Sequence, residues 1–258
     1  MTVTTIDVPT LKPLTHHEAM DLQEHELECT LRMLRMLRSM DDEAWSTPTD
    51  CPAWDIRAMY QHVLGACEAG ASMRENVHQL RRGRAYRKLH GGPLEAALSE
   101  VQVSERADLS PAQVVERLAT TAPKTVRGRN RTPALVRNHA KMAVDGPVHE
   151  TWKLGYLIDI IYLRDLWMHR VDAAHALDKP VELSEDHDGR IVADVVAEWA
   201  RRHGQPFVLE LTGPVGATYV SDPDAPGAEH VSLDAVEFCR ILAGRAPATG
   251  LLATVVPF

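Results

Sequence analysis

Three side chains whose types suit metal binding lie in two short segments. His62 lies in WDIRAMYQHVLG, and Asp165 and His169 lie in RDLWMHRVD. Because Asp165 and His169 are four positions apart, a helix would place them on one face, one turn apart. With a histidine from a facing helix, such a pair can hold a divalent cation inside a bundle. Two imidazoles and one carboxylate leave coordination positions open, as in catalytic zinc sites, and the set also suits other divalent metals.

The same residues also have a simpler interpretation. An Asp and a His at this spacing are common on helices, and an ion pair on a buried helix explains them without a metal. Asp172, three residues after His169, is a candidate catalytic residue that would orient an imidazole N–H. A carboxylate on the helix surface or at a cap explains Asp172 equally well.

The hydrophobic pattern predicts a mainly helical chain with a few strands near its end. Helices are expected over 14–40, from Trp54 or Asp55 to 82, within 93–120, and over 134–144, 154–177, 185–203 and 231–244, with Asp55, Ser110 and Ser232 as N-caps. The segment 154–177 is apolar all round, which indicates a buried helix. Strands are expected over 206–213, 216–222 and 251–258. The first ten residues resemble a tail, and the prolines of 121–150 indicate loops around the short helix.

The predicted fold class is therefore mainly α with a small α+β domain. A helical domain would span 11–178, and the α+β domain would span 179–258. A chain of 258 residues with 45% hydrophobic and 25% charged residues is not mainly disordered. No repeat, phosphate-binding glycine loop or nucleophile elbow occurs.

The net charge and the apolar content of the chain argue against nucleic acid and membranes as partners. A net charge of −8 argues against a general nucleic-acid binder. The sequence shows no apolar stretch of roughly 18 residues and no signal-peptide layout, so we expect no membrane partner. The cysteines (Cys29, Cys51, Cys67, Cys239) are widely spaced, which indicates reduced thiols in the cytoplasm, with Cys51 and Cys67 buried. The basic runs 81–90 and 124–141 are interpreted as solvated faces, with an anionic ligand as the alternative.

Two segments carry a resemblance to a known family. WSTPTDCPAWDIRAMYQHVLG, 45–65, resembles the first signature of the mycothiol-dependent maleylpyruvate isomerase family, which belongs to the DinB-like metal-binding superfamily. RDLWMHRVDAAHAL, 164–177, resembles its second signature, an acidic residue followed by W-x-H-x-x-D. The C-terminal segments DAVEFCRILAGR and LLATVVPF are similar to the family's small sterol-carrier-like domain. The resemblance covers nearly the whole chain and is weakest over 80–150.

The resemblance implies a DinB-like four-helix bundle followed by the small domain, with His62, Asp165 and His169 as ligands of a divalent metal, which by analogy with the family is zinc. These are the residues that spacing selects. Family members often have Glu where Asp165 stands, which puts this ligand in doubt. Arg245 lies where the family's small domain places a basic residue, so it is a candidate catalytic partner for a substrate carboxylate. A surface arginine after a helix explains Arg245 equally well.

The implied activity is that of an isomerase or S-transferase with mycothiol as its cofactor. The metal-bound thiol would react as a thiolate with an electrophilic small-molecule substrate. Addition, bond rotation and elimination give isomerisation, whereas a retained adduct gives S-transfer. The excess of Arg over Lys, 22 to 6, suits a GC-rich actinobacterial source, where mycothiol is the main small thiol.

Two other functions remain open on the same fold. The first is a non-catalytic ligand-binding or regulatory protein, which the replacement of Glu by Asp165 favours. The second is a metal-dependent hydrolase, in which bound water is the nucleophile. The substrate and the choice between a monomer and a homodimer are not determined by the sequence.

Overall fold

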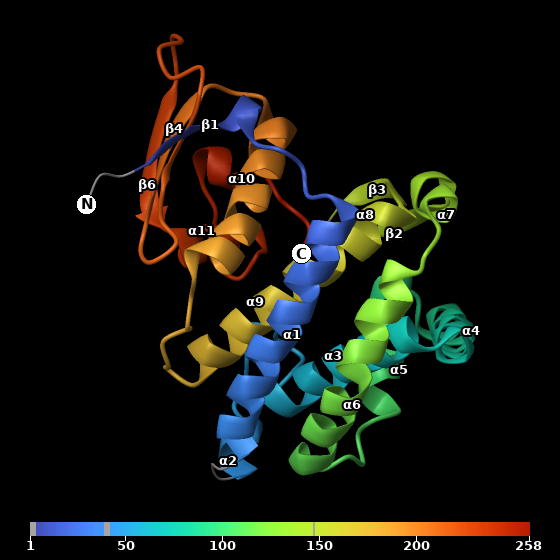
Figure 1. The fold of residues 1–258 in the computed structure, drawn as a ribbon. Helices are drawn as coiled ribbons and strands as arrows, with labels where there is room; N and C mark the ends of the chain where they lie inside the picture. Colours follow the sequence, from blue (N-terminus) through green and yellow to red (C-terminus); the bar gives the residue numbers. More distant parts are fainter. Residues whose placement is uncertain (1–3, 39–41, 147) are drawn as a thin grey trace. The chain divides into compact units, whose positions relative to one another are not determined.

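The computed structural model describes residues 4–38, 42–146 and 148–258, which fall into two compact units (Figure 1). One unit spans Thr15–Pro180. The other combines Val181–Phe258 with the N-terminal residues up to Leu14. The expectation of an N-terminal tail is therefore wrong for the described residues, because β1 (Thr5–Asp7) joins the sheet of the second unit.

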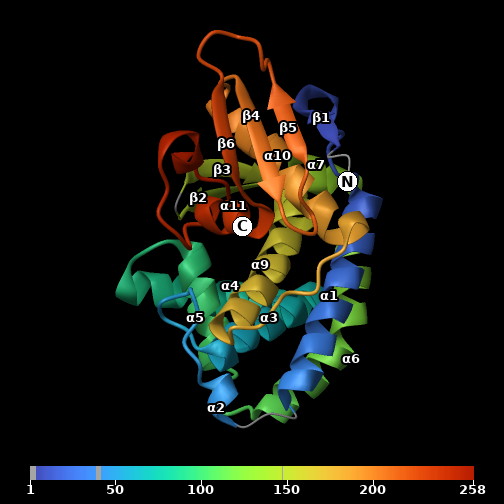
Figure 2. The ribbon, with the colours of Figure 1, turned by 90° about the vertical axis from the view of Figure 1, so that its left-hand side faces the viewer.

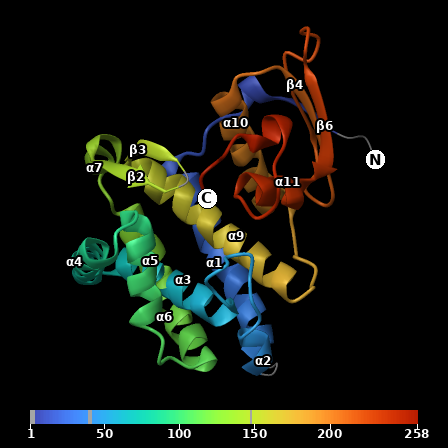
Figure 3. The same cartoon turned by 180° about the vertical axis from the view of Figure 1, so that it is seen from behind.

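The first unit is helical, as the sequence predicts. Its elements are α1 (His16–Arg38), α2 (Asp42–Trp45), α3 (Ile56–Ala71), α4 (Met73–His90), α5 (Leu94–Ser104), α6 (Pro111–Asn130), α7 (Ala134–His139), β2 (Lys141–Asp145), β3 (His149–Lys153), α8 (Leu154–Tyr156) and α9 (Tyr162–Ala176). Helices α1, α3, α6 and α9 share one hydrophobic core, which includes Leu27, Leu64, Leu118 and Leu166. Figure 3 shows α3 between α6 and α9. The predicted Met40 end of the first helix lies outside the described residues.

Helix α3 begins at the predicted cap and ends earlier than predicted. The Oδ1 atom of Asp55 accepts a hydrogen bond from the backbone N–H of Ala58 at 2.8 Å. The helix stops at Ser72, whose backbone is extended (φ −144°, ψ 117°) and whose side chain caps α4. The prediction of one helix to 82 is wrong because Gly70 and Ser72 are weak helix formers and Ser is a favoured N-cap.

Helix α6 begins at the predicted cap, Ser110, which forms a capping box with Gln113. The loops predicted from Pro123 onward are wrong, because α6 continues through this proline to Asn130. Its last turns bury Thr125 and Val126, and packing of this kind outweighs the local cost of an interior proline. The helix predicted over 134–144 ends at His139, and the chain then forms the β2–β3 hairpin.

The predicted buried helix over 154–177 is confirmed, with one irregularity. Between α8 and α9 the residues Leu157–Ile161 form a π-helical turn. The side chain of Gln23 on α1 donates a hydrogen bond to the Ile158 carbonyl at 2.7 Å, which satisfies a polar group of this turn. Turns of this kind are frequent at functional sites. Within the described residues, no helix is long and apolar enough to cross a membrane.

The second unit is a small sheet covered by helices. Its elements are β1, a 3-10 turn (Val8–Thr10), a π-helical turn (Glu185–Gly189), α10 (Arg190–His203), β4 (Phe207–Thr212), β5 (Thr218–Ser221), β6 (Glu229–Asp234), α11 (Ala235–Leu242) and a 3-10 turn (Gly250–Ala253). The strand order is β1-β5-β4-β6, with β4 antiparallel to β5 and parallel to β6. Figures 1 and 2 show α10 and α11 on the same face of the sheet. The predicted helix at 185–203 and the strands at 206–213 and 216–222 are confirmed.

Two predictions near the C-terminus are wrong. Ser232 does not cap a helix over 231–244; it lies in β6, and Asp234 caps α11 by accepting from the N–H groups of Val236 and Glu237. The apolar run 251–258 forms no strand in the described structure. Its Val256 is buried and donates its backbone N–H to the Leu242 carbonyl of α11, so the segment packs on a helix instead of a sheet edge.

The Asp55 cap predicts a stability effect that a single substitution measures. We expect Asp55→Ala to lower the free energy of unfolding of the helical unit by about 1 kcal/mol, because an N–H at the start of α3 loses its acceptor. Urea unfolding followed by far-UV circular dichroism checks this value. The exposed Asp108, replaced by Ala, is the control and is expected to change stability by less than about 0.5 kcal/mol. Equal effects of the two substitutions would contradict the capping role.

Candidate metal centre

The structure brings the three predicted ligand residues together. His62 extends from α3, and Asp165 and His169 extend from α9, which packs against α3. The Nε2 atom of His62 lies 3.7 Å from Asp165 Oδ2, and the Nε2 atom of His169 lies 3.3 Å from Asp165 Oδ1. One potential ligand atom from each residue lies within 4.8 Å of the other two. We call these three residues the metal cluster.

The metal cluster is buried at its imidazoles and open at its carboxylate. His62 is 9% exposed and His169 is 3% exposed, whereas the side chain of Asp165 is 25% exposed. Within the described residues, His169 Nε2 and His62 Nδ1 are buried and make no hydrogen bond. Buried polar atoms in folded proteins nearly always have a partner, so these two nitrogens need an explanation.

The cluster is also electrostatically coupled. Burial raises the pKa of Asp165, but His169 and His62 outweigh this effect and hold the pKa well below its usual value. Burial lowers the pKa of His169, but the charge of Asp165 and the contact with Asp172 outweigh it and raise the pKa well above its usual value. The carboxylate of Asp165 is therefore ionised at neutral pH. The imidazole of His169 tends to keep a proton, and a cation would have to displace this proton to bind there.

Trp54 fixes the orientation of His62. The indole stacks on the imidazole, with ring centroids 4.8 Å apart and planes inclined by 28°. The loop that carries Trp54 is tied back on itself, because the Trp54 carbonyl accepts from both the backbone N–H and the hydroxyl of Thr49. Spacing does not identify this residue, although it lies in the segment 45–65 that carries the resemblance.

Asp172 lies behind His169, as its proposed orienting role requires. It is completely buried, which removes the surface interpretation, and its Oδ2 atom lies 3.3 Å from His169 Nδ1. The thiol of Cys51 donates to the same oxygen at 3.6 Å. Cys51 was expected to be buried; it is only partly so, because it lies in the loop before α3. Cys51, His169 and Asp172 form a second group with metal-ligand geometry.

Arg245 lies in the second unit, after α11. Its Nη1 atom donates to the Ala243 carbonyl at 3.0 Å, and its backbone N–H donates to the Arg240 carbonyl at 2.8 Å. The catalytic role of Arg245 stays a prediction.

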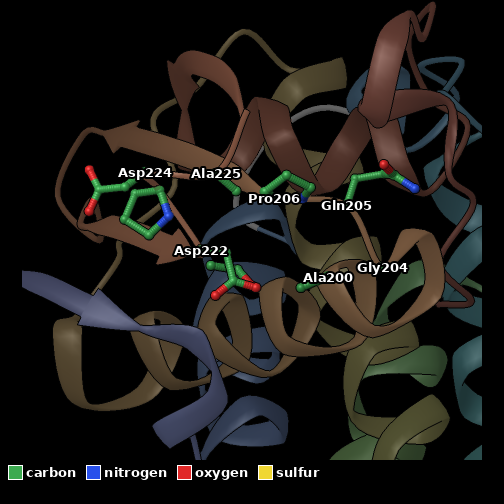
Figure 4. A pocket seen from close by; sticks show the side chains of 9 residues that line it. Ala200, Gly204, Gln205, Pro206, Asp222, Asp224 and Ala225 are labelled. Atoms are coloured by element: carbon green, nitrogen blue, oxygen red, sulfur yellow. The ribbon is translucent and has the colours of Figure 1, made fainter. Parts of the chain in front are cut away.

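A cavity of about 460 Å³ also lies in the second unit (Figure 4). It is lined by Ala200, Gly204, Gln205, Pro206, Ser221, Asp222, Pro223, Asp224 and Ala225. None of the predicted site residues lines it, and it has no histidine or cysteine. It therefore offers no imidazole or thiol chemistry of the kind that the metal cluster offers.

Comparisons with known proteins agree with the resemblance. Residues 27–174 match the family model of the mycothiol maleylpyruvate isomerase N-terminal domain. A crystal structure of the mycothiol-dependent maleylpyruvate isomerase is similar, with 17% identity and a TM-score of 0.55 over 92% of this chain and 93% of that one. A variant of that enzyme with one histidine replaced by alanine gives 16% identity, the same TM-score and the same coverage.

No curated protein matches the chain. At these identities the two solved structures establish the fold, whereas the family model spans more than half of the sequence. The family match points to an enzyme, since the family is named for an isomerase. The chain belongs to the family of the mycothiol maleylpyruvate isomerase N-terminal domain.

Proposed function

We propose that this chain is a metal-dependent enzyme in which a small thiol, mycothiol, adds to an electrophilic small molecule, with isomerisation or S-transfer as the outcome. The observation that carries the proposal is the convergence of the His62 and His169 Nε2 atoms on the carboxylate of Asp165. The family and the two similar structures, which are named for a mycothiol-dependent isomerase, support the choice of thiol.

The residues of the metal cluster fit a divalent cation. Two imidazole nitrogens and one carboxylate are the donor set of catalytic zinc sites, and they leave positions open for a thiol. A cation would satisfy His169 Nε2, which is buried without a hydrogen bond among the described residues. Asp165 is shorter than Glu by one methylene, yet its oxygens lie within 3.7 Å of both imidazoles. We therefore propose that His62, Asp165 and His169 hold zinc.

When bound, a divalent cation lowers the pKa of a thiol ligand, so that the thiol reacts as a thiolate at neutral pH. The chain's own residues prepare this site. The carboxylate of Asp172 lies where it accepts the Nδ1–H of His169, so the proton that a cation would displace is the one on Nε2, beside Asp165. Trp54 restricts the ring of His62 by stacking and covers one of its faces. We propose Asp172 as a positioning residue on this ground.

We propose the cytoplasm as the working compartment. All cysteines of the chain are free thiols in the structure, which supports a reducing environment. The proposed partners are the thiol and the electrophilic substrate. The proposed source of the protein is an actinobacterium, in which mycothiol is the main small thiol.

Metal content tests the proposed ligands directly. Purified wild-type protein is expected to bind about one zinc ion per chain and to gain thermal stability with added zinc by mass action. His62→Ala and Asp165→Ala are expected to lose both effects, and the exposed His139, replaced by Ala, is the matched control. Inductively coupled plasma analysis and thermal unfolding provide the measurements. A wild-type protein that holds only trace metal at neutral pH would contradict the proposal.

Turnover assays separate the proposed enzyme from a hydrolase on the same ligands. The zinc-loaded protein is assayed with an electrophilic cis-alkene, with and without mycothiol. Thiol-dependent isomerisation or adduct formation supports the proposal. In a second assay the zinc-loaded protein is given an ester without any thiol, and hydrolysis of the ester favours the hydrolase.

Replacement of Asp172 tests its positioning role. Asp172→Asn is expected to weaken zinc affinity by about 10–100-fold, because the neutral amide no longer orients and polarises the imidazole of His169. Competition with a fluorescent zinc chelator measures the affinity. Asp178→Asn, at an exposed position just after the same helix, is the control. Unchanged zinc affinity in Asp172→Asn would show that Asp172 is only structural.

The raised pKa of His169 predicts the pH dependence of zinc binding. A group with a raised pKa keeps its proton as the pH rises into the neutral range, and this proton must leave before the nitrogen can bind a cation. Zinc affinity is therefore expected to increase steadily from about pH 6 to about pH 8, with proton release on binding. Calorimetry in buffers of different ionisation enthalpy measures both quantities. Constant affinity over this range would contradict the coupling.

A further inference from the structure

The π-helical turn before α9 is held by side chains from two other helices. Gln23 of α1 donates a hydrogen bond to the Ile158 carbonyl of this turn. The carboxylate of the next residue, Asp159, lies 2.7 Å from the Nδ1 atom of His16 on α1 and 3.3 Å from the Nη1 atom of Arg137 on α7. The side chain of His16 is 17% exposed, and those of Asp159 and Arg137 are 15% exposed. The turn is thus fixed by a largely buried group of charged and polar residues.

His16 has a second acceptor on the other edge of its ring. Its Nε2 atom lies 3.3 Å from the backbone carbonyl oxygen of Asn130, the last residue of α6. A neutral imidazole carries one N–H and one lone pair, whereas the protonated ring carries two N–H groups. Because a carboxylate and a carbonyl oxygen can only accept, both contacts of His16 are hydrogen bonds only when the ring is a cation. The carbonyl also lies at the C-terminal end of a helix, where a positive charge is favoured.

Charged groups on the surrounding elements have opposing effects on this ring. Asp159 of the turn is in direct contact and favours the cation. Arg137 of α7 binds the other oxygen of the same carboxylate, so its positive charge opposes protonation of the ring. The two atoms in direct contact with the ring, a carboxylate oxygen and a carbonyl oxygen, both favour the protonated form. The other charged residues beside these contacts in sequence are bound to other groups or exposed: Glu18 accepts from the Thr15 backbone N–H, His17 pairs with Asp21, Arg129 donates to Gln23, and Arg131 is exposed.

We propose that His16 is a pH-sensitive latch on the turn before α9. As a cation, the ring donates from Nδ1 to Asp159 and from Nε2 to the end of α6. As the pH rises, Nε2 releases its proton to solvent, and its lone pair then faces the Asn130 carbonyl oxygen, which repels it. The hydrogen bond to α6 is therefore present at acidic pH and is lost at alkaline pH. The latch needs neither metal nor thiol, so it goes beyond the proposed function and is tested separately from it.

Opening of the latch acts on the helix that carries two residues of the metal cluster. Tyr162, the first residue of α9, directly follows the turn, and Asp165 lies in the first turn of this helix. A π-helical turn is rare and short, so it depends on contacts with its surroundings. When one of these contacts is lost, the turn and the start of α9 open more often while the rest of the unit stays folded. The pH thereby sets the local mobility beside Asp165.

Hydrogen exchange of the full chain tests the latch. Protection factors of the backbone amides of Leu157–Ile161 are measured at about pH 5.5 and at about pH 8, on the two sides of the range in which a histidine changes its charge. Each factor is relative to an unfolded peptide at the same pH, which removes the intrinsic effect of pH on exchange. We expect about tenfold higher protection at the acidic pH, because a hydrogen bond from a charged donor shifts an opening equilibrium by about this factor.

Two variants separate the latch from other effects of pH. His16→Ala is expected to show the low protection at both pH values, whereas His17→Ala is expected to behave as the wild type does, because the side chain of His17 is 87% exposed. Both variants keep the metal cluster, so the pH dependence of metal binding affects them equally. A pH dependence that persists unchanged in His16→Ala overturns the inference. Wild-type protection that differs by less than about twofold between the two pH values overturns it as well.

A wild-type measurement covers the case in which His16→Ala does not fold. In ¹⁵N-labelled protein, the ring of His16 is identified by nuclear Overhauser contacts to Asn130, and the chemical shifts of its nitrogens show which of them carries a proton. Both nitrogens are expected to be protonated at acidic pH, and Nδ1 alone at alkaline pH, because Asp159 accepts from Nδ1 at 2.7 Å. A neutral ring with its proton on Nε2 overturns the inference.

Discussion

Helix α9 brings ionisable side chains into the interior of the helical unit, and each of them must be compensated there. Arg170 forms a two-point ion pair with Glu26 of α1, at 2.6 and 2.9 Å, which fixes the rotation of α9 about its axis. With this rotation set, the preceding residue His169 lies between Asp165 and Asp172. The geometry of the metal cluster thus depends on the placement of buried charge along one helix.

Helix α3 completes the arrangement from the opposite side. Its start is fixed by the Asp55 cap, about two turns before His62, and the preceding loop places Trp54 on the His62 ring. Its far end lies against α6, where Gly128 allows the helix to approach the Gly70 carbonyl closely. Because both ends of α3 are held, His62 faces α9 in a defined orientation.

Much of this arrangement was predictable because local rules determine it. The four-residue spacing of Asp165 and His169 requires only a helix, and the caps at Asp55 and Ser110 require only the right residue before an amphipathic run. The continuation of α6 through Pro123 was not predictable, since it depends on packing against α3. Residues 5–7 are too few to show a strand pattern. They form a strand because they pair with β5, which is more than 200 positions away in the sequence.

Features of the candidate site that depend on distant contacts were also invisible in the sequence. The contact between Cys51 and Asp172 joins residues 121 positions apart. Arg129 is buried where α6 packs against α1 and α9, and it makes no ion pair among the described residues. The basic run 124–141 carries no sign of which of its cations is buried. Spacing selects side chains that share one helix, whereas burial and pairing are set by the other helices of the bundle.

Anomalous diffraction from zinc-loaded crystals tests the central claim most directly, since two clusters with ligand geometry share His169. The account predicts one zinc peak bound by His62, Asp165 and the Nε2 atom of His169, at about 2.0–2.2 Å from each ligand atom. A zinc ion bound instead by Cys51, Asp172 and the Nδ1 atom of His169 would contradict the account.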